Sequence, residues 1–117
     1  MVFGCFTLHE IPVSFWESVF REFEKRVKSG GYLLIVDSQQ DRDPIEGGDP
    51  STAQMRRFFL DRFQEDFYEP YYPEYRSQSL EEWAERFGFE KVEQRYLLLS
   101  KGSLFRKKMQ TADQLIR

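Results

Sequence analysis

The sequence is poor in the residues that build disulfides and metal centres. It contains one cysteine, Cys5, and one histidine, His9, among 117 residues. A single cysteine excludes a disulfide within the chain and is typical of a reducing compartment, so we expect a cytoplasmic protein. One histidine and one cysteine are too few for a zinc site of the usual kind, and we expect no bound metal.

Two further absences limit the partners. Basic residues are not in excess, because 17 Lys and Arg stand against 20 Asp and Glu for a net charge of −3. Nucleic-acid-binding domains usually carry a basic face, so no nucleic-acid partner is expected. No apolar run approaches the roughly 20 residues of a membrane span, and the first residues lack the pattern of a signal peptide, so no membrane partner is expected.

Enough apolar material is present for one hydrophobic core. The composition is 40% apolar and 17% aromatic. At this length we expect one domain over residues 1–117, with a weakly patterned tail at 109–117 that is either helical or frayed.

The clearest local pattern is a strand-sized apolar run that ends in an acid. Tyr32–Val36 follow two glycines, Gly30-Gly31, and lead to Asp37. Such a run predicts a strand buried on both faces, whose C-terminal end lies where α/β proteins bind ligands. Residues 1–8 are also apolar without alternation and predict a second buried strand.

A helix is expected between these two strands. Ser14 and Glu17 have the spacing of a capping box, and the apolar residues that follow recur every three or four positions. Gly30-Gly31 are expected to end this helix. A strand, a helix and a strand in this order predict a right-handed parallel pair.

The middle of the chain predicts a long loop and a second helix. Residues 38–50 are polar and contain two prolines and two glycines, which is typical of a functional loop beside a strand end. Ser51 and Gln54 are expected to cap the next helix, whose apolar stripe should face the core; its members are Met55, Phe58, Phe59 and Phe63. The proline-rich segment 67–75 is not expected to be a regular helix.

The last third predicts a short helix and a hairpin. Ser79 and Glu82 form a capping box, and Gly88 suits the helix C-terminus. Residues 89–99 and 103–108 predict two strands about a turn at Lys101-Gly102. The expected fold is therefore α/β, with a mixed sheet of about four strands: a parallel pair plus a C-terminal antiparallel hairpin, with packed helices.

These elements and residues resemble the C-terminal half of a class I S-adenosylmethionine-dependent methyltransferase of the type 11-like kind. Residues 6–12, Phe-Thr-Leu-His-Glu-Ile-Pro, are similar to the family's fourth strand and its H-E-[LI]-P exit. Residues 20–37 are similar to its helix and fifth strand, often R-V-L-K-P-G-G-x-L-x-I-x-D, here one residue shorter. Residues 68–72, Tyr-Glu-Pro-Tyr-Tyr, are similar to the H-E-P-Y-Y stretch of a subgroup, with Tyr68 at the position of its histidine.

The resemblance implies a partial Rossmann-like methyltransferase fold. The family's sheet order is 3-2-1-4-5-7-6, and this portion corresponds to 4-5-7-6. The cofactor would be S-adenosylmethionine and the substrate a small-molecule acceptor. The family's glycine-rich loop and the acid after its second strand are not among these 117 residues, so the chain alone is expected to be inactive.

The resemblance also implies site residues. Phe6 and Thr7 would lie beside the methionine portion of the cofactor, and His9 would be a general base. From position alone, His9 is equally well a turn residue that caps a backbone carbonyl. Asp37, Ser38 and Gln39 would bind the acceptor, and Gln40 shares their position and could add a hydrogen bond. An acid at the place of Asp37 is often only a strand terminator.

Glu69, Tyr71 and Tyr72 are further candidates for the acceptor pocket. The alternative is an aromatic lid that packs on the second helix, since aromatic clusters are more often core than site. Glu10 is expected to hold the turn after the first strand.

Two readings without catalysis stay open. Residues 1–8 would form an unpaired sheet edge, which favours a homodimer or a partner chain at this edge. The chain would then be a self-associating or regulatory module of methyltransferase-like fold. A folded remnant with neither ligand nor partner is the other reading.

Overall fold

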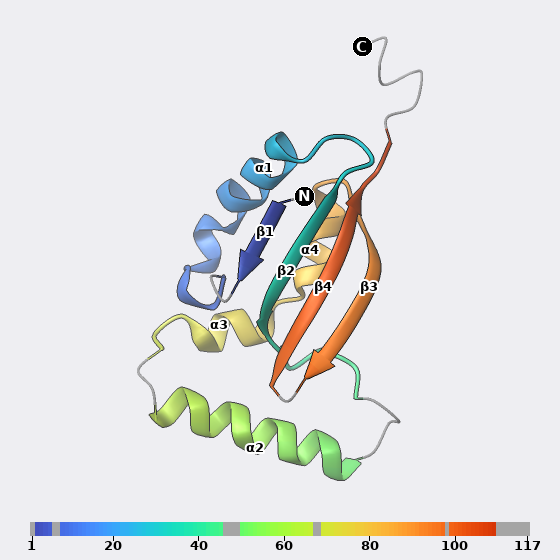
Figure 1. Ribbon diagram of the computed structural model, residues 1–117. Helices are drawn as coiled ribbons and strands as arrows, with labels where there is room; N and C mark the ends of the chain where they lie inside the picture. The colour runs from blue at the N-terminus through green and yellow to red at the C-terminus, as the bar shows by residue number, and fades with distance from the viewer. Residues whose placement is uncertain (1, 6–7, 46–49, 67–68, 98, 110–117) are drawn as a thin grey trace.

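The computed structural model describes residues 2–5, 8–45, 50–66, 69–97 and 99–109; for residues 2–5 and 97 it describes the backbone alone. Figure 1 shows the helices and strands in space. Their order along the chain is β1 (Val2–Cys5), the 3₁₀ turns Leu8–Glu10 and Val13–Phe15, α1 (Trp16–Arg26), β2 (Tyr32–Ser38), α2 (Pro50–Asp66), α3 (Tyr72–Ser77), α4 (Leu80–Arg86), β3 (Phe89–Leu97) and β4 (Ser100–Lys107).

The strands form one sheet in the order β1-β2-β4-β3. β1 pairs parallel to β2, and Cys5 lies beside Val36 in the register. β4 runs antiparallel to both β2 and β3. The predicted α/β class and the antiparallel pairing of the last two strands are confirmed. The C-terminal ends of β1 and β2 lie at the same end of the sheet, where α3 also lies (Figure 1).

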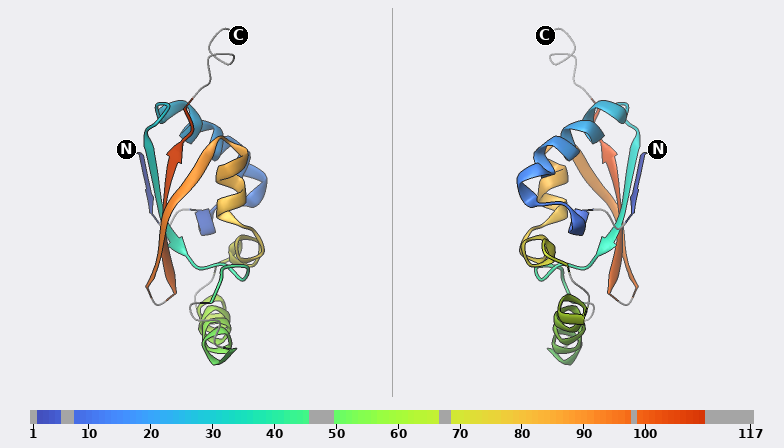
Figure 2. Two further views of the ribbon diagram at one scale, coloured as in Figure 1. Left: turned by 90° about the vertical axis from the view of Figure 1, so that its right-hand side faces the viewer. Right: turned by 90° about the vertical axis from the view of Figure 1, so that its left-hand side faces the viewer.

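The hydrophobic core lies between the sheet and two helices. Figure 2 shows α1 and α4 on the same face of the sheet. Leu33, Ile35 and Phe105 point from the strands into this layer and are almost fully buried. On the opposite face, Leu34, Val36 and Leu104 are only half-buried, because side chains of a strand alternate between its two faces.

Aromatic rings fill the space between α1 and α4. The Phe20 ring stacks on Trp83 and Phe87 at centroid distances of 5.9 and 5.8 Å. Trp16 lies edge-on to Tyr75 at 5.8 Å, so this helix layer also contacts α3. Trp16 and Phe20 have no exposed surface, and their burial supplies much of the energy that holds α1 on the sheet.

The ends of α1 differ from the sequence prediction. Ser14 lies in a 3₁₀ turn, and α1 begins at Trp16 without a side-chain cap, so the predicted capping box is wrong. The Trp16 indole instead donates to the Ile11 carbonyl at 3.1 Å and fixes the entry to the helix. The helix ends before the glycines, because Val27 turns to an extended conformation and is buried. Gly30, at φ +78°, makes the turn into β2.

The first strand does not include Leu8, although the prediction ran to residue 8. β1 is described over Val2–Cys5, and residues 1, 6 and 7 lie outside the described residues. Leu8 already belongs to a 3₁₀ turn, and its backbone N–H donates to the Asp37 carboxylate at 3.0 Å. This bond holds the turn Leu8–Glu10 against the end of β2.

The stripe on α2 is the largest departure from the prediction. Met55, Phe58 and Phe59 are 60, 59 and 47% exposed, and only Leu60 of this helix is buried. The fourth member, Phe63, is half-buried, and its ring centroid lies 5.2 Å from that of Tyr72. Figure 1 shows α2 across the end of the sheet, away from the α1 and α4 layer. Pro50 is already helical, so Ser51 lies in the first turn rather than before it.

The remaining differences concern α3 and the hairpin. Residues 72–77 are helical because Pro73 stands in the first turn, where its missing N–H costs nothing. Lys101-Gly102 belong to β4 rather than to a turn, since the buried Lys101 side chain pairs with the buried Asp43.

The cap on α4 is confirmed: Ser79 accepts a hydrogen bond from the Glu82 N–H, and Gly88 has φ +88°.

Removing the Phe20 ring should destabilise the fold strongly. Phe20→Ala leaves a cavity between two stacked rings and should lower the free energy of unfolding by about 3–5 kcal/mol. Urea denaturation followed by far-UV circular dichroism measures the change. Phe58→Ala is the matched control; it removes the same ring from an exposed position and should stay within about 0.5 kcal/mol of the parent. Equal losses in both variants would contradict this assignment of the core.

Candidate functional site

The candidate site lies at the C-terminal ends of the parallel strands β1 and β2. The turn Leu8–Glu10 follows the first strand, and Asp37 and Ser38 end the second. α3 packs against this turn, so three segments distant in sequence meet here. This end of a parallel pair is the usual place for ligands in α/β proteins.

The buried carboxylate of Asp37 organises the site. It is 1% exposed and accepts hydrogen bonds from three groups. They are the backbone N–H of Leu8 at 3.0 Å, the backbone N–H of Ser38 at 2.7 Å and the His9 ring Nδ1 at 2.7 Å. Because an ionised carboxylate can only accept, Nδ1 carries the proton, and the lone pair of a neutral His9 ring resides on Nε2.

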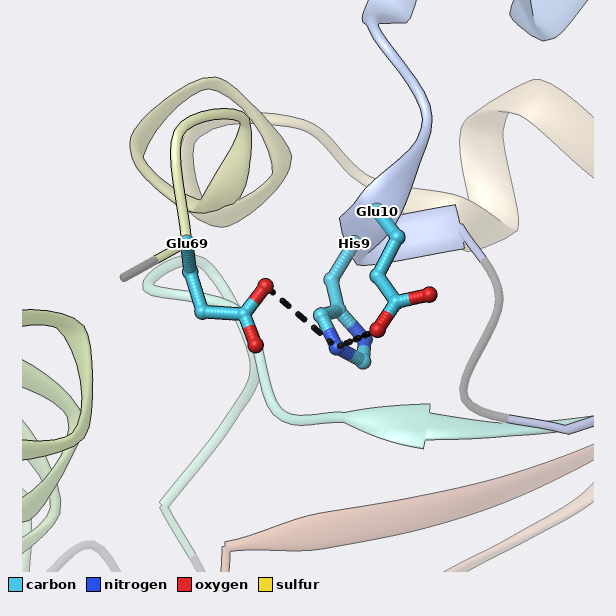
Figure 3. A group of neighbouring side chains, drawn as sticks. All are labelled: His9, Glu10 and Glu69. Atoms are coloured by element: carbon cyan, nitrogen blue, oxygen red, sulfur yellow. Dashed lines mark ion pairs between the residues drawn. The ribbon is translucent and has the colours of Figure 1, made fainter. Parts of the chain in front are cut away.

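The His9 ring is held on several sides. The residue is 6% exposed, and its ring lies edge-on to Tyr72 and Tyr75 at centroid distances of 5.7 and 6.1 Å. Nε2 faces Glu10 at 3.9 Å and Glu69 at 4.0 Å (Figure 3). Burial lowers the pKa of His9, but the hydrogen bond to Asp37 and the charges of the three acids outweigh it, so the pKa is raised.

Two tyrosines complete the wall beside His9. The Tyr72 hydroxyl is hydrogen-bonded to the Ser38 hydroxyl, and the Tyr75 hydroxyl donates to the Ser38 carbonyl. Burial raises the pKa of Tyr72, and the bond to Ser38 offsets this only in part. Burial also raises the pKa of Tyr75 well above its ordinary value. Both hydroxyls therefore stay protonated near neutral pH, and the basic groups of the site are His9 and the carboxylates.

A second buried polar cluster fixes the loop that leaves β2. The side-chain amide of Gln40 donates to the Tyr75 carbonyl at 2.9 Å, while its oxygen accepts from Lys101 Nζ at 2.8 Å. Lys101, 1% exposed, also pairs with Asp43 at 2.8 Å and with Glu81 at 3.2 Å. Burial raises the pKa of Glu81, but the charge of Lys101 outweighs it and the net shift is downward. The loop is thereby tied to both β4 and α4.

The structure brings together five of the candidate residues chosen from the sequence. They are His9, Asp37, Ser38, Glu69 and Tyr72. Gln39 and Tyr71 point elsewhere. The Gln39 side chain bonds to the Ser100 carbonyl at 3.4 Å and accepts from Arg56 at 3.3 Å, and Tyr71 is 40% exposed. Phe6 and Thr7, the candidates for cofactor contact, lie outside the described residues.

Two contributors to the site were not predicted in these roles from the sequence. Tyr75 lies one helical turn after Tyr72, a spacing that would have indicated it had Pro73 not argued against a helix. Gln40 was a candidate for hydrogen bonds to a substrate, but its side chain is bonded to the Tyr75 carbonyl and to Lys101. Glu10 was expected to brace the turn, yet its carboxylate is 64% exposed and faces His9.

A groove of about 730 Å³ includes Gln39, which follows Ser38 in the chain, and its lining contains none of the side chains around His9. It lies between α2, the loop after β2 and the end of the β3–β4 hairpin. Its lining is mostly apolar and consists of Gln39, Pro44, Ile45, Thr52, Met55, Arg56, Phe59, Tyr96, Leu99 and Ser100. Two members of the α2 stripe, Met55 and Phe59, thus line a concave surface, which suits the apolar part of a small molecule.

Within the described ranges, no helix is long and apolar enough to cross a membrane. Searches of protein-family models, of curated proteins and of solved structures found no match to this chain.

The pairing of His9 with Asp37 should make stability depend on pH. Because the folded pKa of His9 is raised, its stabilising contribution is complete below pH 6.5, the ordinary value, and is lost as pH rises through the folded pKa. The chain has one histidine, so its NMR ring signals report this pKa without ambiguity. We expect a midpoint above 6.5 in buffer containing a chelator.

Two variants give this measurement its controls. Asp37→Asn should lower the His9 midpoint, because it removes the strongest stabilising partner of the imidazolium. Glu85→Gln removes an exposed carboxylate of α4 that does not contribute to the shift and should leave the midpoint unchanged. A parent midpoint at or below 6.5 would contradict the assigned pairing.

Proposed function

We propose that this chain is the acceptor-binding half of a class I S-adenosylmethionine-dependent methyltransferase domain. In this role it transfers a methyl group to a small molecule once a segment with the glycine-rich loop completes the cofactor pocket. The carrying observation is the strand order β1-β2-β4-β3, with β4 antiparallel to both neighbours. It corresponds strand by strand to the order 4-5-7-6 expected from the sequence resemblance.

The arrangement of the site supports this function. The H-E-I-P turn after β1 and the acid at the end of β2 are joined by the bond between His9 and Asp37. Glu69 and Tyr72, from the stretch similar to H-E-P-Y-Y, lie against the same ring. All three pieces of the resemblance therefore contribute side chains to one place at the end of the parallel strands.

The chemistry of methyl transfer suits these groups. S-adenosylmethionine would supply the methyl group when bound, and the acceptor that receives it would have to lose a proton. His9 Nε2 would take that proton, and Asp37 would stabilise the imidazolium that forms, as in other carboxylate–histidine pairs. The groove lined by Met55 and Phe59 would hold the apolar part of the acceptor.

The cofactor half of the site would come from outside the described residues. In the family, strand one pairs with strand four, which corresponds to β1, the edge of this sheet. The half-buried Leu34, Val36 and Leu104 on the face without α1 and α4 offer an apolar surface for the same segment. The single cysteine fits a cytosolic location for such an enzyme.

A ligand titration followed by NMR tests this function on the chain alone. S-adenosylhomocysteine, the demethylated product, should shift the signals of residues 8–10 and 37–40, even where binding to the half pocket is weak. Adenosine serves as the control ligand, because it lacks the methionine portion that the turn after β1 would contact. Shifts confined to other parts of the chain, or none at millimolar ligand, would contradict the proposal.

A fusion provides the stronger form of the same test. The chain is joined to the N-terminal half of a class I methyltransferase from the subgroup with the H-E-P-Y-Y stretch. The fused protein should bind S-adenosylmethionine more tightly than the chain alone, as isothermal titration measures. Far-UV circular dichroism establishes folding first, and a folded fusion that binds no cofactor counts against the assignment.

The position of β1 favours one other function, a self-associating module. As the edge strand of this sheet it presents backbone groups that a second copy can pair with. In this reading the chain is a homodimer joined through residues 2–5, and the site near His9 is not catalytic.

A charged residue in the edge strand separates the two functions. Phe3→Lys should convert a dimer formed through β1 to monomer or aggregate, because charged side chains disfavour pairing at a sheet edge. Light scattering after size exclusion measures the mass. Tyr32→Lys is the control, since Tyr32 is 41% exposed and lies on β2, away from the edge. A dimer that survives Phe3→Lys would exclude association through β1.

A further inference from the structure

We propose that His9, Glu10 and Glu69 form a binding site for a divalent first-row transition-metal cation, such as Zn²⁺ or Mn²⁺. This inference goes beyond methyl transfer and does not depend on it. The sequence alone predicted no metal, because one histidine gives none of the usual ligand spacings.

The three side chains converge on one point. One ligand atom from each, the His9 Nε2 and a carboxylate oxygen from Glu10 and from Glu69, lie within 4.8 Å of one another. Figure 3 shows both carboxylates directed at the same ring nitrogen, one from the turn after β1 and one from the segment before α3. Atoms bound to one such cation are about 3 to 3.5 Å apart, so the carboxylates need to close in only modestly.

The three side chains differ in how much of their surface is exposed to solvent. The Glu10 side chain is 64% exposed and that of Glu69 is 18% exposed, whereas that of His9 is 8% exposed. The imidazole is thus the most enclosed of the three ligands, and the exposed Glu10 side chain has the most room to adjust its torsions to an ion.

His9 is prepared as a metal ligand by its buried partner. Metal-binding histidines usually donate their second ring N–H to a carboxylate, which fixes the tautomer and makes the other nitrogen more basic. Here Asp37 accepts the bond from His9 Nδ1 at 2.7 Å. The carboxylate is itself held in position by the backbone N–H groups of Leu8 and Ser38. This supporting layer distinguishes the cluster from an ordinary group of surface acids.

The charge around the ring also favours a cation. Among the ion pairs of the described residues, Glu10 and Glu69 pair only with His9 and with no lysine or arginine. By contrast, the buried Asp43 pairs with Lys101. Two carboxylates and a neutral imidazole present two negative charges that a divalent cation neutralises.

The donor set indicates the class of metal. Carboxylate oxygens suit Mn²⁺, and imidazole nitrogen suits Zn²⁺ and Fe²⁺. A set of one nitrogen and two oxygens is therefore compatible with each of these divalent ions. Three protein ligands leave positions for water or for an oxygen of a small molecule. A cation bound to Nε2 excludes His9 as a general base and would polarise an acceptor oxygen in its place.

Metal binding is tested on the purified chain without cofactor. After treatment with a chelator and its removal, the protein is titrated with ZnCl₂ in a calorimeter, and with MnCl₂ while the ring signals of the single histidine are followed by NMR. We expect saturable binding of one Zn²⁺ per chain. Mn²⁺ should broaden the His9 signals before those of residues in α4.

Substitutions assign the ligands. Glu10→Gln and Glu69→Gln should each weaken Zn²⁺ binding, and Asp37→Asn should weaken it on the order of 10- to 100-fold through the loss of support for the ring. Glu85→Gln, an exposed carboxylate on α4, is the matched control and should bind as the parent does. Cys5→Ser should also bind as the parent does, because sulfur is not among the proposed ligands.

Three results would overturn the site. They are no saturable binding of Zn²⁺, binding unchanged in both Glu10→Gln and Glu69→Gln, and binding lost in Cys5→Ser. Each variant is first checked for parental circular dichroism, and Glu10→Gln remains informative in any case because its exposed side chain contributes little to the fold. A failure to bind Zn²⁺ does not change the result expected from the titration with S-adenosylhomocysteine, so the two proposals can be rejected independently.

Discussion

The buried carboxylate of Asp37 is the interaction on which the functional end of this fold depends. It accepts from the backbone after β1, from the backbone at the end of β2 and from the His9 ring. The first two bonds fix the exits of two strands relative to each other, and the third orients the only imidazole in the chain. Burying a carboxylate is costly unless hydrogen bonds replace those it loses from water. The two strand exits and the His9 ring provide these bonds, and the carboxylate in turn holds them in place.

The distribution of buried polar groups divides the molecule into two regions. Between α1, α4 and the sheet, the interior is a stack of aromatic rings. At the C-terminal end of the parallel strands, it contains Asp37, Gln40 and Lys101, each nearly inaccessible. Burying such groups is costly unless each is hydrogen-bonded, and here their partners hold the turn after β1 and the loop after β2 in place. The rigid side chains needed by a binding site are therefore concentrated at this end.

Local signals could be read from the sequence, and long-range ones could not. The cap of α4 was predictable because Ser79 and Glu82 act across a single turn. The stripe on α2 has helical spacing, but spacing does not say which surface a helix meets, and Met55 and Phe58 are exposed. The predicted turn at Lys101 failed because its partner Asp43 lies 58 residues away. His9 and Asp37 were each chosen as candidates, yet their bond, across 28 residues, appeared only with the fold.

Both proposed activities of this site, proton transfer and metal binding, depend on the lone pair of His9 Nε2. Asp37 fixes the proton on Nδ1, so the neutral ring directs this lone pair at Glu10 and Glu69. The same acids raise the pKa of the ring and stabilise its protonated form, in which Nε2 has no lone pair to offer. Folding is therefore favoured by the state in which the site is blocked. A proton acceptor here becomes active only as pH rises, while the stabilisation from the ion pair declines, so stability and activity have opposite dependence on the same proton.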